Sequence, residues 1–194
     1  MNIRSYPHRR SAAGFTLIEL VISIGVFSIL VTLAVGSIAR SLRTQRQLSA
    51  MIAANTNVSL ALEQMAREIR TGYSFAPASG VVCNDSSVPC ISDELEFENA
   101  GGDLVAYRLV NNSIERIVTP QSGQDEIGYL TGNDAEVTYL SFVLVGKDAR
   151  DKRPPRITIA ISMAPQGSTR DVALQGIETN LQTTVSSRSV DGSD

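Results

Sequence analysis

The chain has 194 residues, of which 43% are hydrophobic and 19% are charged, with a formal net charge of −3. This size suits one globular unit in addition to a distinct N-terminal segment. Ser-His-Asp, Cys-His and Ser-Lys catalysis are disfavoured, because the only histidine, His8, lies in a basic leader and the only lysines, Lys147 and Lys152, share one polar segment.

Residues 1–14 form a basic leader without an acidic residue. A leader of this kind usually stays in the cytoplasm and directs the following chain across the membrane. The two flanks of the next segment carry equal numbers of arginines, so charge alone does not fix the orientation. These arginines are Arg4, Arg9, Arg10, Arg40, Arg43 and Arg46.

Residues 15–39 are apolar enough to cross a bilayer. No charge occurs from Leu20 to Ala39, and as a helix the whole segment would be about 37 Å long at ~1.5 Å per residue. Glu19 is the exception. A carboxylate within a membrane costs on the order of 2.5–3.5 kcal/mol, so it needs a partner or a role. In an uncut chain it could pair with Arg10, whereas cleavage before Phe15 would create an amine that a neighbouring subunit could offer.

The helical pattern continues through residues 40–72. Apolar residues recur there at steps of three, four or their multiples, which predicts an amphipathic stripe. Glu63 and Arg67 have the spacing of an ion pair, and Gly72 predicts a helix stop through the left-handed conformation. We interpret the arginines on this helix as solvated or headgroup-facing. The stripe contains Leu48, Ile52, Val58, Leu62, Met65 and Ile69.

The only two cysteines, Cys83 and Cys90, lie in a loop-like segment rich in polar residues and predict a disulfide. Disulfides persist outside the cytosol, so the bulk of the chain is expected to be extracytoplasmic. Two unpaired thiols, or half of a metal site, remain the alternatives, although no further Cys or His lies nearby.

Residues 73–188 change to the two-residue period of β-strands. Asn111, Asn112 and Ser113 predict the turn of a hairpin, and residues 189–194 form a polar tail that we expect to be disordered. The predicted fold class is α+β, with one long helix packed on an antiparallel sheet. The candidate strands are residues 93–99, 104–110, 113–118, 136–146, 156–164 and 179–188.

Carboxylates are the remaining candidates for chemistry, as a calcium site or an acid pair. Glu94, Glu96 and Glu98 alternate with Leu95 and Phe97, as the solvent face of a half-buried strand does. We therefore expect no metal, no cofactor and no enzymatic activity. Without its leader the chain would lose three of 17 basic residues and none of 20 acidic ones, leaving a net charge of −6 that disfavours nucleic acid. The carboxylates are Asp93, Glu94, Glu96, Glu98, Asp148 and Asp151.

The stretch Gly14-Phe15-Thr16-Leu17-Ile18-Glu19, preceded by two arginines and followed by an uncharged helix, resembles the processing site of type IV prepilins. This resemblance implies that a prepilin peptidase cuts between Gly14 and Phe15 and methylates the new N-terminus on Phe15. It also implies that Glu19 carries the charge that recruits and registers subunits during assembly.

Residues 60–72 and 181–188 are similar to minor pilins and to the J-class pseudopilins of type II secretion. Two departures speak against a major pilin: Gly36 stands where many have proline, and the cysteine loop follows the helix directly. The resemblance implies an inner-membrane precursor that later enters a pilus or pseudopilus. Its implied partners are other pilin or pseudopilin subunits, the prepilin peptidase/methyltransferase, the inner-membrane assembly platform and membrane lipids.

Two rival interpretations of the N-terminal segment remain. An ordinary secretory signal could be cut among the small residues Ala34 to Ala39, which would leave Glu19 without a role. A plain single-pass anchor could instead hold an extracytoplasmic binding protein or enzyme at the membrane.

Overall fold

A computed structural model describes residues 14–77, 89–146, 154–168, 174 and 176–188. The chain divides into two compact units, Met1–Gln45 and Arg46–Asp194. Helix α1, Leu17–Thr71, contributes to both units. In the first unit every described residue is exposed, so this part of α1 has no core of its own.

In the second unit, α1 buries one stripe of small and apolar side chains with helical spacing. The predicted stripe is confirmed from Val58 to Ile69 but is wrong at its start, because Leu48 is 53% exposed and Ile52 is 65% exposed. Burial begins with Ala54 instead. The buried residues of the helix are Ala54, Val58, Ala61, Leu62, Met65 and Ile69.

The described part of the second unit also contains antiparallel strands in two sheets, with the orders β1-β3-β4-β5-β6 and β2-β7-β8-β9. The α+β prediction of a long helix packed on antiparallel strands is confirmed, although the strands form two sheets rather than one. Their bounds are β1 Tyr73–Pro77, β2 Cys90–Ser92, β3 Leu95–Glu98, β4 Leu104–Val110, β5 Ser113–Thr119, β6 Glu126–Tyr129, β7 Ala135–Val145, β8 Arg156–Pro165 and β9 Thr179–Ser186.

The hairpin between β4 and β5 follows the prediction. Val110 pairs with Ser113, and both turn residues have positive φ, 50° at Asn111 and 61° at Asn112. Asparagine tolerates this left-handed conformation, and two such residues in succession give a turn whose twist matches that of the strands. The turn therefore sets the register of the pair.

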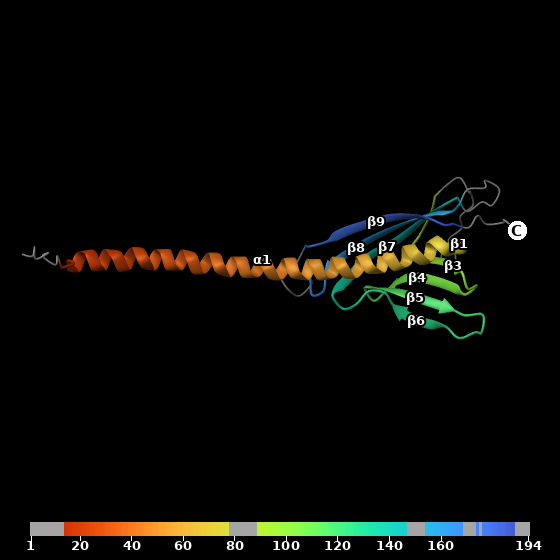
Figure 1. The fold of residues 1–194 in the computed structure, drawn as a ribbon, viewed down its shortest axis with the longest axis horizontal. Helices are drawn as coiled ribbons and strands as arrows, with labels where there is room; N and C mark the ends of the chain where they lie inside the picture. Colours follow the sequence, from red (N-terminus) through yellow and green to blue (C-terminus); the bar gives the residue numbers. More distant parts are fainter. Residues whose placement is uncertain (1–13, 78–88, 147–153, 169–173, 175, 189–194) are drawn as a thin grey trace, which may run out of the picture. The chain divides into compact units, whose positions relative to one another are not determined.

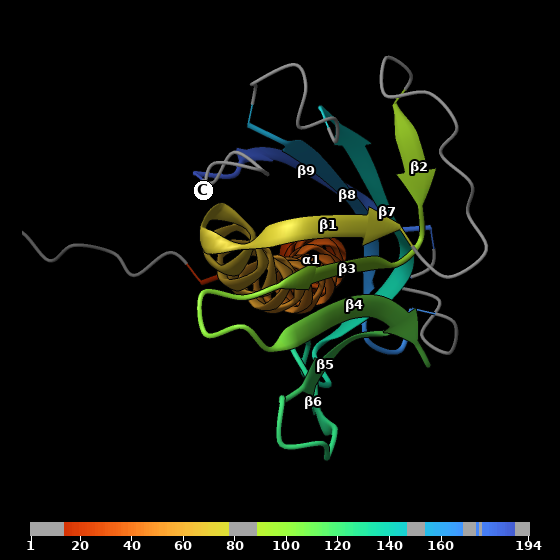
Figure 2. The same cartoon turned by 90° about the vertical axis from the view of Figure 1, so that its right-hand side faces the viewer.

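Both sheets and α1 contribute to a single hydrophobic core within the second unit. Figures 1 and 2 show β7, β8 and β9 along one side of this half of the helix, and β4, β5 and β6 along another. Phe97 lies at the centre of an aromatic row, with ring centroids 5.5 Å from Phe75 and 5.8 Å from Tyr107. The residues of this core are spread along the sequence, from Ala54 in α1 to Val185 in β9.

The helix ends at Thr71, as predicted, but the predicted reason for Gly72 is wrong. Gly72 does not have a positive φ. A Cβ at this position would instead lie 2.5 Å from a ring carbon of Phe97, so only glycine lets the ring pack this closely. Two carbonyls at the end of the helix are bound by the residues just after β9: the Arg188 N–H donates to Arg70 O, and Ser187 Oγ donates to Gly72 O.

Candidate functional site at the N-terminal end of the helix

Thr16 caps the start of α1. Its Oγ1 accepts a hydrogen bond from the Glu19 N–H at 3.3 Å, and its carbonyl accepts one from the Leu20 N–H at 3.2 Å. Thr16 and Glu19 thus have the spacing of a capping box, in which a threonine is followed three residues later by a glutamate. The helix start is encoded by the same residues that carry the processing motif.

The carboxylate of Glu19 lies in the first turn of the helix, where the helix dipole favours negative charge. It is exposed, and among the residues that the structure describes it has neither an ion-pair partner nor a hydrogen-bond partner. Capping gives Glu19 a local role, but it leaves the charge itself available to a group outside the described part of the chain.

The scissile bond predicted between Gly14 and Phe15 precedes the first helical residue, Leu17. A Cβ added to Gly14 would meet no atom within 4 Å, and the side chain of Phe15 is 79% exposed. The bond therefore lies in a non-helical, uncovered stretch, as a peptidase substrate requires.

Three hydroxyl groups of the apolar segment are satisfied within the helix. Ser23 Oγ donates to Glu19 O, Ser28 Oγ donates to Ile24 O, and Thr32 Oγ1 donates to Ser28 O, at 2.7–2.8 Å. In a bilayer, polar groups must find partners inside the protein because no water is present. These residues therefore do not oppose burial of the segment in lipid or among apolar helices.

The apolar side chains of this segment are uncovered. The most apolar 18-residue window of α1 has a mean hydropathy of 2.5, and none of it is buried, so the helix meets the length and composition of a membrane span. Such a surface is far larger than soluble monomers normally expose. The large exposed residues of the first unit are Phe15, Leu17, Ile18, Leu20, Val21, Ile22, Ile24, Val26, Phe27, Ile29, Leu30, Val31, Leu33, Val35, Ile38 and Leu42.

Comparison with known proteins decides what this arrangement represents. Residues 9–35 match the family model of the prokaryotic N-terminal methylation motif. The chain carries the type IV prepilin signature. For a prepilin, this signature implies processing by a peptidase and association with pilin subunits, and the long apolar helix fits membrane anchoring. No curated protein and no solved structure matches the chain at a significant level.

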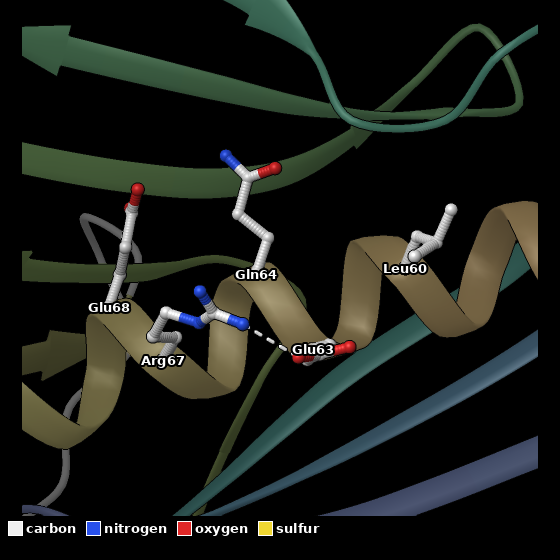
Figure 3. A pocket seen from close by; sticks show the side chains of 5 residues that line it. All are labelled: Leu60, Glu63, Gln64, Arg67 and Glu68. Atoms are coloured by element: carbon white, nitrogen blue, oxygen red, sulfur yellow. Dashed lines mark hydrogen bonds and ion pairs between the residues drawn. The ribbon is translucent and has the colours of Figure 1, made fainter.

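A hollow of about 380 Å³ lies beside the second half of α1, lined by Leu60, Glu63, Gln64, Arg67 and Glu68. Figure 3 shows Gln64 and Glu68 pointing to one side, while Glu63 is joined to Arg67. The Glu63–Arg67 distance of 2.7 Å confirms the predicted pair. Because both side chains are mostly exposed, the pair contributes little to stability.

Glu68 links the helix to the first sheet. It accepts a hydrogen bond from the buried Tyr107 hydroxyl, and its two oxygens contact Arg116 at 3.0 Å each. Burial, followed by the hydrogen bond to Glu68, raises the pKa of Tyr107 far above its usual value. The polar groups of this cluster are already paired, which indicates a structural role. Sequence reasoning missed the cluster, because 39 residues separate Glu68 from Tyr107 and 48 separate it from Arg116.

A second hollow, of about 430 Å³, has Asp93, Glu94, Arg108, Leu109, Thr138, Tyr139 and Leu140 around it. Arg108 Nε donates to the buried Glu115 at 2.7 Å. Burial raises the pKa of the Glu94 carboxyl, and Arg108 opposes this shift. Within the described ranges, no three of the His, Cys, Asp and Glu residues are grouped as metal ligands would be.

The other candidates from the sequence are only partly described. Glu96 and Glu98 alternate in β3 with buried Leu95 and Phe97, which is the pattern expected of a half-buried strand. Asp148 and Asp151 lie outside the described residues. Cys90 is buried in β2, whereas Cys83 lies outside the described residues, so the disulfide stays a prediction.

Proposed function

We propose that the protein is a minor pilin or pseudopilin, made as a membrane-anchored precursor and assembled through its N-terminal helix into a pilus, a pseudopilus or the initiating tip complex of either. The observation that carries this proposal is the prepilin signature at residues 9–35 on a helix whose apolar half is entirely uncovered. That surface needs a lipid environment at first and a bundle of similar helices afterwards.

In this proposal a prepilin peptidase removes residues 1–14, and Phe15 becomes a methylated N-terminus. Support comes from the exposed, non-helical position of the Gly14–Phe15 bond and from the helix cap two residues further along. Cleavage would leave Thr16 and the cap intact, so the mature helix starts with its geometry already formed.

Glu19 is proposed to pair with the N-terminal amine of a neighbouring subunit. The observation behind this role is a carboxylate that has no partner among the described residues and stands at the head of an apolar helix. The new amine lies on Phe15, four residues before Glu19 in the same chain. In a surrounding of low dielectric constant, the attraction between the Glu19 carboxylate of one subunit and the Phe15 amine of its neighbour would be strong. The pairing requires a stagger between subunits and therefore supports a head-to-tail, open assembly.

Two features support a minor pilin or pseudopilin over a major pilin. The helix continues through Gly36, where many major pilins have a proline. The paired-cysteine loop, if formed, would join β2 to the segment after the helix rather than close the C-terminal end of the domain. An uninterrupted apolar half of α1 suits a subunit that packs this half against the helices of neighbouring subunits.

The test is the mass of the N-terminal peptide of protein purified from membranes, compared between cells with and without a prepilin peptidase. We expect the peptide to begin at Phe15 and to carry one added methyl group only when the peptidase is present. An intact leader in peptidase-competent cells would refute the proposal. Cleavage between Ala34 and Ala39 would show an ordinary secretory signal instead.

A further inference from the structure

The hollow of about 430 Å³ lies where the two sheets meet. Its walls come from the connection between β2 and β3, from β4 and from β7, and Figure 2 shows β4 beside β7. The register of β7 shifts between Val137 and Tyr139, so the successive residues Thr138 and Tyr139 are both exposed. Bulges of this kind re-aim side chains and are often found next to functional sites. The volume of the hollow lies within the range of about 300–1,000 Å³ that is typical of binding clefts.

The hollow carries an excess of negative charge. Arg108 is the one cation among its lining residues, and the buried Glu115 already binds it, with 2.7 Å between Nε and Oε2. Within the described ranges, Asp93 and Glu94 have no ion-pair partner. Glu94 is half-buried, and this burial is the main cause of its raised pKa. A cation that enters the hollow is therefore attracted by two carboxylates.

The other lining residues suit a long basic side chain. Leu109 and Leu140 offer apolar surface to the methylene groups of a lysine or arginine. The ring of Tyr139 is 52% exposed and can attract a cation to its face. A bare metal ion would use neither feature, and among the described residues no three acidic, histidine or cysteine side chains are grouped as its ligands would be. The lining thus favours a basic segment of a polypeptide.

One connection between strands has the opposite charge. Residues 147–153, Lys-Asp-Ala-Arg-Asp-Lys-Arg, contain four basic and two acidic residues, including the only lysines of the chain. This segment joins β7 to β8 and lies outside the described residues. Every other connection between the described strands is neutral or negative in sequence, and the most negative is Asp93-Glu94 at the hollow. The most basic connection therefore complements the most acidic one.

We propose that the hollow is a docking site for residues 147–153 of a second copy of the chain. The same copy is poorly placed to supply this segment, because β7 continues for six residues from Tyr139 to Val145, or about 20 Å, before the segment begins. A neighbour in the same orientation, displaced by about this length along β7, brings its own segment to the hollow. Both copies then keep the same direction relative to the membrane.

The contact is heterologous, because one copy contributes the hollow and the other contributes the basic segment. A displacement between copies of the same orientation can be repeated without closing, so it produces an open polymer. The inference therefore rests on the proposed assembly, to which it adds a charge contact between the sheet domains of neighbouring subunits. Since this contact is open to water, salt should weaken it.

Carbodiimide cross-linking of the full-length chain in isolated membranes and filaments tests the contact, because this reagent joins a carboxylate to a lysine amine that touches it. We expect a dimer on denaturing gels, with linked peptides that join Asp93 or Glu94 to Lys147 or Lys152. The double variant Lys147→Arg with Lys152→Arg keeps the charge but removes the reactive amines, so it should abolish this link. Glu126→Gln removes an exposed acid on β6 and is the matched control, which should leave the dimer unchanged.

A charge exchange separates docking from a loss of folding. Glu94→Lys should lower the dimer at least fivefold, and so should Lys147→Glu combined with Lys152→Glu. A chain with all three substitutions again places opposite charges together and should recover at least half of the parent dimer. A misfolded variant could not be restored in this way.

Three results would overturn the proposal: no dimer in the parent chain, a link confined to single chains, or a dimer that Glu94→Lys leaves unchanged. The N-terminal mass of the same sample keeps this contact distinct from the proposed function. A chain that begins at Phe15 but gives no cross-link refutes the contact alone, whereas an intact leader in peptidase-competent cells refutes the proposed function.

Discussion

Gly72→Ala should destabilise the protein without straining its backbone. The φ of Gly72 is not positive, so alanine can adopt the same conformation. The added Cβ, however, would lie 2.5 Å and 2.9 Å from two ring carbons of Phe97 and 3.1 Å from the carbonyl oxygen of Glu98. Carbon atoms normally pack about 3.5–4.0 Å apart, so either the ring or the chain must shift by about 1 Å.

The ring has little room to move. Phe97 is completely buried and lies between Phe75 and Tyr107, with centroid distances of 5.5 Å and 5.8 Å. Overpacking of this kind typically costs about 1–3 kcal/mol. For a domain of this size each kcal/mol lowers Tm by roughly 2–4 °C. We therefore expect a clear loss of stability with the fold retained.

The assay is urea unfolding of the purified protein in detergent, followed by tyrosine fluorescence. Gly128→Ala is the matched control, because its Cβ meets no atom within 4 Å and its φ is not positive. It should change the free energy of unfolding by less than about 0.5 kcal/mol. In a Phe97→Leu background the cost of Gly72→Ala should fall by at least about 0.5 kcal/mol, since the ring carbons are gone. Equal stabilities of the two glycine variants would refute the steric explanation.

The remaining predictions concern the processing site, the assembly charge and the buried tyrosine. Gly14→Val should slow cleavage at least about tenfold in a pulse-chase experiment, if the peptidase recognises glycine at this position. A Cβ at residue 14 would meet no atom within 4 Å, so the larger residue does not disturb the fold and any slowing reports recognition by the peptidase. Normal cleavage would exclude recognition of Gly14. Glu19→Ala should leave cleavage unchanged but lower incorporation into filaments, as loss of one partner of a buried ion pair costs about 3–5 kcal/mol, whereas Glu63→Ala, which loses only an exposed pair, should assemble normally. Equal incorporation of the two variants would remove the charge-pairing role. Tyr107→Phe should flatten the alkaline loss of stability. The raised pKa keeps Tyr107 protonated in the folded state while the unfolded chain loses this proton above about pH 10, so unfolding becomes easier by up to ~1.4 kcal/mol per pH unit in the parent chain; parallel pH profiles would contradict this cause.

Local patterns in the sequence predicted the features that depend on neighbouring residues. The long uncharged segment and the spacing of Gly14, Phe15 and Glu19 were enough for the helix and the processing motif. Two successive asparagines were enough for the hairpin, because the turn conformation is a property of those residues. Strands β1, β2 and β6 were not predicted, since three to five residues are too short to display an alternating pattern.

Features that depend on residues far apart in the sequence could not be predicted from local patterns. Gly72 was correctly predicted to end the helix, but the predicted reason, a left-handed conformation, was wrong. The observed reason is the close packing of Phe97, which no neighbouring residue in the sequence reveals. Glu68 looked like an ordinary surface charge, although Tyr107 and Arg116 from two strands bind it. The cap on the last carbonyls comes from Ser187 and Arg188, more than 110 residues along the chain.

The two wrong members of the helical stripe show where the chain's own fold stops protecting the helix. Leu48 and Ile52 keep the spacing of the buried stripe, yet burial starts only at Ala54. A periodic pattern reports that a face will be covered, but it does not say by what. The stripe residues from Ala54 to Ile69 are covered by the chain's own sheets, whereas Leu48, Ile52 and the large apolar residues before them are exposed. The apolar surface that needs an external partner therefore extends beyond the membrane-length segment by at least three helical turns. A helix from a neighbouring subunit can cover this extra length, while the hydrocarbon core of a bilayer, about 30 Å thick, is already filled by the segment before it.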